Sequence, residues 1–277
     1  MPRSKLQHPA SSRTIDAAAI AYDGTSGPPQ PRAIAVEVPV NFIFGSLPFA
    51  VMMASPQDIE DFAYGFTFTE GIVDSSDDIR DVSVEQAEGG FRVSVTLKAE
   101  MMQRHLGRAR NLSGRTGCGV CGIADLKDMP QANGLAAVGA DFDVRSIARA
   151  LRKCQQLQVL NRETRAVHGA AFCRHDGTVI AMREDVGRHN ALDKLIGSLL
   201  RTGVKGPDGF VLITSRASFE MIEKTVRFGA PVLVAMSAPT SLAIERAHAY
   251  GLTLIAVARE DGATLFAPGA ADAEARR

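Results

Sequence analysis

Apolar and polar residues alternate through the first third of the chain, between residues 31 and 106. The stretches AIAVEVPVNFIF and FAVMMAS, joined by the turn GSLP, predict one strand hairpin, and IRDVSVEQ and FRVSVTL around EGG predict a second. Between the hairpins, SPQDIEDFAYGFTFTEG has helical spacing, with Ser55 as the expected N-cap and Gly71 just past the helix end. We therefore expect a small α+β domain over 31–106.

The pattern changes in the second half, which we expect to form one α/β domain over 141–277. DVRSIARALRKCQQLQVL has helical spacing, and two short apolar runs around HDG predict a hairpin. After that, the apolar strands GFVLITS, PVLVAMS and LTLIAVA alternate with helical segments. Such alternation is typical of a parallel or mostly parallel sheet with helices on both faces.

Two segments carry little periodicity. Residues 1–30 are rich in proline, serine, glycine and alanine, and we expect a disordered tail there. Residues 107–140 are rich in glycine and contain Cys118 and Cys121 at CxxC spacing. A segment this long without a regular element is usually functional or mobile. We expect a mobile loop and linker that carries the two cysteines.

Composition narrows the classes of function. The 277 residues contain 31 basic and 31 acidic side chains, and the net charge of zero argues against general binding to nucleic acid. The first residues contain no apolar run of signal-peptide type, and no stretch has the length of a membrane span. The 4 cysteines are too few for a disulfide framework. We expect a cytoplasmic protein, in which a CxxC motif indicates metal or reactive-thiol chemistry.

Three interpretations of the CxxC motif compete. A structural zinc site needs four ligands, but the chain has no second CxxC and no HxxxH, and the signature of zinc deaminases is also absent. A thioredoxin-like dithiol begins a helix directly after a strand, whereas this motif lies among glycines. A reactive thiol remains, because Arg110 and Arg115 favour the thiolate and a free loop can collect sulfur at one place and deliver it at another. We expect no metal, and we interpret Cys154 and Cys173 as buried structural thiols.

The α/β rhythm also predicts where a ligand binds, namely beyond the carboxyl ends of the strands, where helix N-termini offer free N–H groups. Three polar turns fall there: MREDVGRHNALDK, ITSRASFEMIEK and MSAPTS. Glycine permits close backbone approach, and arginine binds phosphate through paired N–H groups. The simpler alternative is that these residues are helix caps and surface ion pairs, with Ser218 capping its helix. Together they favour a ligand site formed by Asp185, Gly187, Arg188, His189, Asn190, Ser215, Arg216 and Ser218.

Four stretches together resemble one family. TGCGVCG, EDVGRHNALDK, TSRASFEMIEK and SAPTSLAIERAHAYGLTL are similar to the FdhD family of formate dehydrogenase accessory sulfurtransferases, and the likeness runs from about Ala33 to Ala267. The resemblance implies that Cys118 accepts sulfane sulfur as a persulfide from a cysteine desulfurase and that Cys121 assists its transfer. The acceptor it implies is the molybdenum (or tungsten) bis(molybdopterin guanine dinucleotide) cofactor, bound before it enters formate dehydrogenase. A cofactor chaperone without transfer activity and a zinc-stapled regulatory module are the alternatives.

The resemblance also implies a fold and further contacts. The C-terminal part is expected to have a three-layer, cytidine-deaminase-like α/β fold without the zinc site, and the protein is expected to work as a homodimer. GDP is expected to mimic the guanine end of the cofactor. The family often has a TGGxHAA pattern where this chain reads TRAVHGAA, with Arg165 and Ala166 in the glycine places. The contacts that the resemblance adds are His168 and the segment Val257, Ala258, Arg259, Glu260, Asp261 and Gly262.

Overall fold

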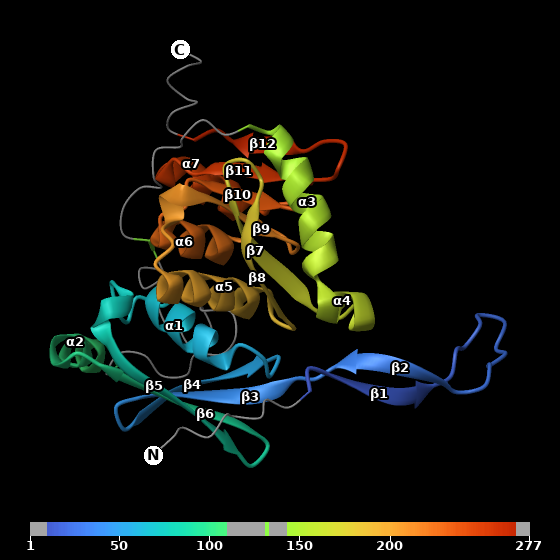
Figure 1. The fold of residues 1–277 in the computed structure, drawn as a ribbon, viewed down its shortest axis with the longest axis horizontal. Helices are drawn as coiled ribbons and strands as arrows, with labels where there is room; N and C mark the ends of the chain where they lie inside the picture. The colour runs from blue at the N-terminus through green and yellow to red at the C-terminus, as the bar shows by residue number, and fades with distance from the viewer. Residues whose placement is uncertain (1–9, 110–130, 133–142, 270–277) are drawn as a thin grey trace.

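The computed structural model describes residues 10–109, 131–132 and 143–269 (Figure 1). Cys118, Cys121 and most of the predicted loop lie outside these residues. The described residues form three sheets of two, six and four strands. None of the helices within them is long and apolar enough to cross a membrane.

The two hairpins predicted in the first third of the chain are confirmed and form one sheet. Its strand order is β4-β3-β6-β5, with antiparallel pairing inside each hairpin and parallel pairing between β3 and β6. Alternate residues of β3 and β6 are buried, as the pattern predicted. The strands are β3 (Val38–Phe44), β4 (Leu47–Ala54), β5 (Ile79–Ala87) and β6 (Gly90–Leu97). Helix α2 (Ala99–Ala109) follows, and a 3-10 turn, Ser76–Asp78, precedes β5.

Helix α1 (Ile59–Thr69) packs on the buried face of this sheet, but its start differs from the prediction. The helix begins four residues after Ser55, and its N-cap is Asp58, with a left-handed φ of 56°. Ser55 is fully buried and its backbone and hydroxyl bond to the second half of the chain, so these groups are not available to cap α1. Gly71 follows the helix end with a positive φ of 71°, as expected.

The predicted disordered tail is wrong for residues 12–30. Strands β1 (Ser12–Ala17) and β2 (Gln30–Ala35) pair antiparallel and form an arm that extends away from the body of the molecule (Figure 1). Most side chains of this arm are exposed on both faces. A strand that buries neither face needs no alternation of apolar and polar residues, so the usual sequence signal is missing. The arm is held at its base, where the Ser12 hydroxyl lies 3.0 Å from a carboxylate oxygen of Glu163.

The second half forms a six-stranded sheet in the order β12-β11-β10-β9-β7-β8. Of its neighbouring pairs, only β9–β10 and β10–β11 are parallel, so the prediction of a mostly parallel sheet is wrong. The difference arises at both edges, because the β7–β8 hairpin and β12 run antiparallel to their neighbours. The strands are β7 (His168–Arg174), β8 (Val179–Asp185), β9 (Gly209–Ile213), β10 (Val232–Ala235), β11 (Thr253–Ala256) and β12 (Thr264–Ala267).

Helices cover both faces of this sheet, which gives the expected three layers. Alternate residues of the central strands point to opposite sides. Ala171, Phe210 and Leu212 pack in one buried cluster with Ile147 and Leu151 of helix α3, while their neighbours along the strands pack in a second cluster with the opposite helices. The helices are α3 (Arg145–Leu157), α4 (Val159–Thr164), α5 (Arg188–Thr202), α6 (Phe219–Phe228) and α7 (Ser241–Tyr250). A 3-10 turn, Gly206–Asp208, precedes β9. The specific likeness to cytidine deaminases stays a prediction.

The two halves share one continuous core, since α1 and α5 lie against each other between the two large sheets (Figure 1). Gly65 on α1 lies against the carbonyl oxygen of Asp193 on α5, and Gly197 on α5 lies against the carbonyl oxygen of Asp61 on α1. A Cβ atom at either glycine would overlap that oxygen. The regions 31–106 and 141–277 are therefore parts of one packed unit.

Candidate functional site

The three polar turns predicted from the sequence meet at one edge of the six-stranded sheet. β8 ends at Asp185, β9 at Ile213 and β10 at Ala235, and the register places His168 of β7 opposite Asp185. Helices α5, α6 and α7 begin after these strands. This edge, called the strand edge below, therefore combines several polar loops with the N-terminal ends of three helices.

Backbone hydrogen bonds join neighbouring turns of the strand edge. The Thr240 N–H donates to Ala217 O at 3.0 Å, and the Met236 N–H donates to Ile213 O at 2.9 Å. The Val257 N–H donates to Ser237 O at 3.2 Å, which adds the segment after β11 to the same row. The turns are thus held in fixed relative positions.

Asp185 is fully buried and points into the protein. One carboxylate oxygen accepts from the Gly187 N–H at 2.8 Å and from Asn190 Nδ2 at 3.0 Å. The other accepts from the Ser55 N–H at 2.9 Å and lies 2.6 Å from Lys194 Nζ. These contacts use both oxygens, so Asp185 fixes the shape of the turn from within.

Lys194 and Asn190 complete this buried group. Lys194 Nζ donates to Ser55 O at 2.8 Å, and its side chain is fully buried. Asn190 Nδ2 also donates to Met53 O at 2.7 Å. Sequence reasoning missed Lys194 and Ser55, although a lysine inside the apolar face of a predicted helix was a signal that it has a buried partner. Asp185 and Asn190 therefore act as positioning residues for Gly187 and Arg188.

The side chains free to meet a ligand lie beside this buried group. Among the described residues, Arg188 Nε, Ser218 Oγ and Glu220 Oε2 are buried atoms without a hydrogen-bond partner. Ser218 is the N-cap residue of α6, yet its side chain makes no capping bond, so the simpler interpretation of its hydroxyl as a helix cap is wrong. Buried polar atoms normally have partners, and exceptions of this kind call for a ligand or water.

The remaining predicted residues of these turns flank this group. Arg216 is exposed. Ser215 is buried, with its hydroxyl 3.2 Å from the carbonyl oxygen of Arg216. His189 is nearly buried, and its Nε2 lies 3.8 Å from Glu220 Oε1. The strand edge thus presents arginine and hydroxyl donors, which suits phosphate groups.

The charged side chains of the strand edge shift the pKa of His168. Burial lowers the pKa of His168, and the positive charges of Arg188 and Arg216 lower it further, while Asp185 opposes the shift. Both guanidinium groups therefore act on one imidazole. A lowered pKa means that the fold favours the neutral ring, so this contribution to stability is present above the unfolded-state pKa and is lost as pH falls through the folded-state pKa.

A titration of His168 tests this arrangement. We expect the Arg188→Gln variant to raise the pKa of His168, because it removes a positive charge, and we expect bound GDP to raise it in the unaltered protein, because its phosphates add negative charge. NMR of the imidazole protons measures both shifts. Arg174→Gln, at the opposite edge of the sheet, is the control and should leave the pKa in place. A titration that GDP does not move would show that its phosphates bind elsewhere.

The segment after β11 is strained where it joins the strand edge. Val257 has a left-handed φ of 53°, which is unfavourable for a β-branched residue. The bond from the Ala258 N–H to Ala235 O, at 3.1 Å, helps to hold this conformation. Strained backbone gathers at functional sites. The strain is therefore a structural reason, independent of sequence resemblance, to include this segment in the candidate site.

The side chains beyond Val257 differ in availability. The guanidinium of Arg259 bonds to Ala258 O at 2.8 Å and also to Met236 O, and the Arg259 N–H donates to Gly262 O at 2.7 Å. Glu260 lies 3.9 Å from Arg152, and Asp261 and Gly262 are exposed. Carboxylates are poor partners for phosphate, and the N–H groups of Val257, Ala258 and Arg259 donate within the protein, so this turn offers a ligand the backbone N–H groups of residues 260–262 and the guanidinium of Arg259.

Arg165, one of the two residues that replace the expected glycine pair, has a backbone conformation that glycine favours. It is the C-cap of α4, with a left-handed φ of 54° and ψ of 26°, a conformation that glycine adopts without steric cost. The turn thus keeps a geometry suited to glycine while carrying an arginine. The Arg165 side chain is exposed.

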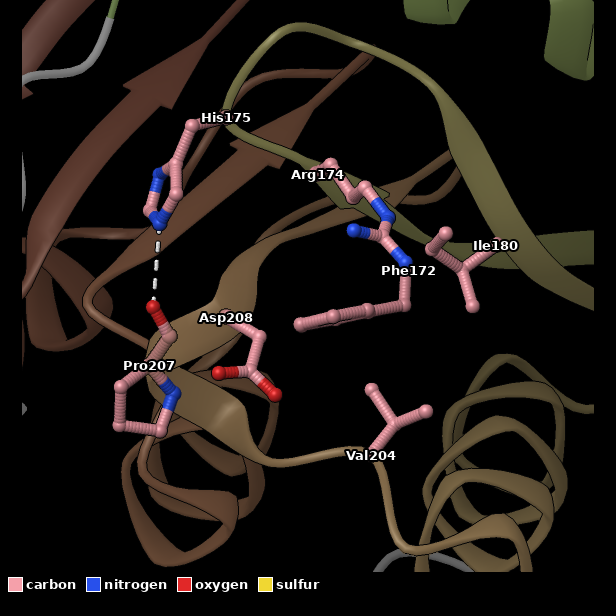
Figure 2. A pocket seen from close by; sticks show the side chains of 7 residues that line it. All are labelled: Phe172, Arg174, His175, Ile180, Val204, Pro207 and Asp208. Carbon is pink, nitrogen blue, oxygen red and sulfur yellow. Dashed lines mark hydrogen bonds between the residues drawn. The ribbon is translucent and has the colours of Figure 1, made fainter.

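A separate surface hollow lies at the other end of β7 and β8. Its volume is about 510 Å³ (Figure 2). His175 Nε2 donates to Pro207 O at 3.0 Å on its rim. None of the predicted site residues lines it, so it is distinct from the strand edge. The lining residues are Phe172, Arg174, His175, Ile180, Val204, Pro207 and Asp208.

The two cysteines within the described residues are buried, as predicted. Cys154 and Cys173 are buried free thiols, and the pKa of Cys173 is raised by its contact with Cys154 and by burial. No group of three or more potential ligands that could hold a metal ion occurs in the described ranges. This finding does not extend to Cys118 and Cys121, whose roles stay predictions.

The fold and the strand edge together define a class, a mixed α/β protein with a rigid, partly unsatisfied edge suited to an anion. The chain belongs to the FdhD/NarQ family, whose model matches residues 35–271. A protein from Xanthomonas euvesicatoria named sulfur carrier protein FdhD is 44% identical over 84% of this chain and 83% of its own length. A protein of the same name from Agrobacterium fabrum is 44% identical over 85% of this chain and 87% of its own.

A solved structure supports the same assignment. The crystal structure of a protein from Desulfotalea psychrophila, described as a formate dehydrogenase accessory protein, has a TM-score of 0.70 and 25% sequence identity to this chain. The match covers 93% of this chain and 97% of the other. The several-sheet α/β fold is thus shared with this solved structure.

Proposed function

We propose that this protein is a sulfur carrier that accepts persulfide sulfur from a cysteine desulfurase and transfers it to a molybdenum bis(molybdopterin guanine dinucleotide) cofactor required by formate dehydrogenase. The observation that carries the proposal is the strand edge, where Arg188 and Arg216 act on His168 and buried donor atoms lack partners. This edge suits the phosphates of a dinucleotide, and the CxxC motif of the same chain suits sulfur. The names of the relatives point the same way.

The sulfur chemistry balances with the two cysteines alone and one external reductant. The Cys118 thiolate attacks the terminal sulfur of the desulfurase persulfide, the S–S bond breaks, and the desulfurase thiolate leaves. Cys121 then attacks the Cys118 sulfur and releases the terminal sulfur as sulfide for the cofactor metal. This step leaves a Cys118–Cys121 disulfide, which is two electrons more oxidised than the two thiols. A cellular dithiol reductant supplies those electrons and restores both thiols.

In this proposal the cofactor is the cargo that the protein carries, and the strand edge is its binding site. Arg188, Arg216 and Ser218 bind phosphate oxygens, and residues 260–262 contribute backbone N–H groups. Asp185, Asn190 and Lys194 keep this surface in shape from beneath. The protein acts as a homodimer in the cytoplasm in this proposal, and GDP serves as a mimic of one end of the cargo.

Two variants separate the two halves of the function. We expect Cys118→Ala to take up no sulfur from an active desulfurase and cysteine, measured by intact mass, while its affinity for GDP stays that of the unaltered protein. We expect Arg188→Ala to load sulfur normally but to lose about 1.5–3 kcal/mol of GDP binding, the range for a hydrogen bond to a charged group. Calorimetry measures the affinity.

A cofactor chaperone without transfer activity is the second candidate, because the strand edge is built without the cysteines. It would be favoured if the unaltered protein bound GDP but gained no sulfur mass beside a desulfurase shown to be active. Stoichiometric zinc that is lost in Cys121→Ala would instead support a metal site at the motif.

A further inference from the structure

A buried carboxylate and a tyrosine hold the backbone of Ala132. The Ala132 N–H donates to Glu223 Oε2 and lies 3.2 Å from the hydroxyl oxygen of Tyr250. Ala132 follows Cys121 by eleven residues and packs against the main core. Figure 1 shows this short green segment beside α6. The chain leaving the CxxC motif is therefore fixed at a defined point of the fold.

The carboxylate of Glu223, the hydroxyl of Tyr250 and the N–H of Ala132 are hydrogen-bonded to one another. Glu223 and Tyr250 are 6% and 9% exposed, and the tyrosine hydroxyl lies 2.9 and 3.1 Å from the two carboxylate oxygens. Arg246 Nε lies 3.7 Å from the same carboxylate. Burial raises the pKa of Glu223, and the bonds from Tyr250 and Ala132 and the charge of Arg246 oppose that shift. A carboxylate is costly to bury without partners, and here the Ala132 N–H, the Tyr250 hydroxyl and Arg246 supply them.

The attachment lies about one helical turn from the start of α6, which faces the strand edge, and at the last residue of α7, which faces away from it. Glu223 follows Glu220 by three residues on α6, about one helical turn, or roughly 4.5 Å along the helix axis. Glu220 and Ser218, at the start of α6, carry the buried atoms without partners described above. One short helix thus holds both part of the candidate cargo site and the chain that follows the cysteines.

We propose that Glu223 and Tyr250 are positioning residues that hold the chain at Ala132, eleven residues beyond Cys121, against α6 and α7, so that the CxxC motif delivers sulfur to cargo bound at the strand edge. The inference rests on the proposed function for its purpose. The attachment itself rests on the contacts of Ala132. The pair touches neither sulfur nor cargo, so its loss slows delivery while loading and cargo binding continue.

The test compares four variants of the full-length protein. In Glu223→Ala we expect hydrogen exchange of the Ala132 amide to accelerate at least about tenfold, the value of one lost bond to a charged acceptor. We expect sulfur loading and GDP affinity to stay within about twofold, and formate dehydrogenase activity in cells carrying only this variant to fall about tenfold. Glu223→Gln keeps an acceptor oxygen, so both its Ala132 amide exchange and its formate dehydrogenase activity should lie close to those of the unaltered protein. Tyr250→Phe is a smaller change with the same expected direction, and Glu245→Ala, an exposed carboxylate on α7, is the matched control.

Each other outcome overturns part of the proposal. Unchanged exchange in both Glu223→Ala and Tyr250→Phe would show that the attachment does not exist in solution. Faster exchange with full dehydrogenase activity would show that it is structural only, as would equal losses of GDP affinity and activity. If the unaltered protein takes up no sulfur, the proposed function fails and with it the purpose of the pair, while the exchange measurement still decides whether Ala132 is held.

Discussion

Alanine at Gly197 is expected to destabilise the protein by about 3 kcal/mol or more, which is above the usual cost of overpacking a core. The added Cβ would overlap the carbonyl oxygen of Asp61, which belongs to the backbone of α1 and has no side-chain freedom with which to move. Relief requires α1 and α5 to separate, and that separation opens the core between the two large sheets. Urea unfolding followed by circular dichroism measures the change.

The expected destabilisation by Gly197→Ala has the opposite sign to the effect that helix propensity alone predicts. In an exposed helix interior, alanine is more favourable than glycine by about 1 kcal/mol. Gly262→Ala is the control, because a Cβ there meets open space and the residue has no positive φ. A Gly197→Ala protein as stable as the control would mean that α1 and α5 do not cross at this point.

Replacement of Lys194 by methionine is expected to cost about 3–5 kcal/mol, the range for removing one partner of a buried ion pair. Methionine fills much of the same volume, but it leaves the Asp185 carboxylate without a positive charge in a fully buried place. Ser55 O also loses its donor. We expect the affinity for GDP to fall as well, because the 185–190 turn loses the group that shapes it.

Lys98→Met is the matched control for this prediction. Lys98 lies 3.2 Å from Asp78 in an ion pair that is 44% exposed on the lysine side, so its loss should cost less than about 1 kcal/mol. Equal effects of the two replacements on the unfolding free energy would show that the Asp185–Lys194 pair is not buried in solution. A stable Lys194→Met protein with normal GDP affinity would remove the turn from the binding surface.

The sequence predicted the elements with a regular period and missed contacts between distant parts of the chain. Both hairpins of the first sheet and the three helices after β8, β9 and β10 follow from alternation and helical spacing. The strand edge was predicted from the alternation of strands and helices, because the turns that follow neighbouring strands lie at the same end of the sheet. Strand β12 and the ordered β1–β2 arm lacked a periodic signal and were not predicted.

The sequence predicted which polar residues lie at the strand edge, but not which of them point into the protein and which are available to a ligand. Asp185 and Arg188 are three residues apart, yet one points inward and the other has a buried atom without a described partner. That difference depends on Ser55 and Lys194, and the contact with Ser55 spans 130 residues of sequence. Ser55 itself has the local pattern of a helix cap. Only the folded chain shows that its groups are used elsewhere.

The contact between Ser55 and Asp185 also sets an order of events for a newly made chain. Loop closure over 130 residues comes late, after local hairpins and helices have formed. Until residues 53–55 dock onto β8 and α5, the turn that presents Arg188 lacks its bonds to the Ser55 N–H and Met53 O. If the proposed function holds, cargo binds only to a chain that has completed folding, and a partly folded chain carries none.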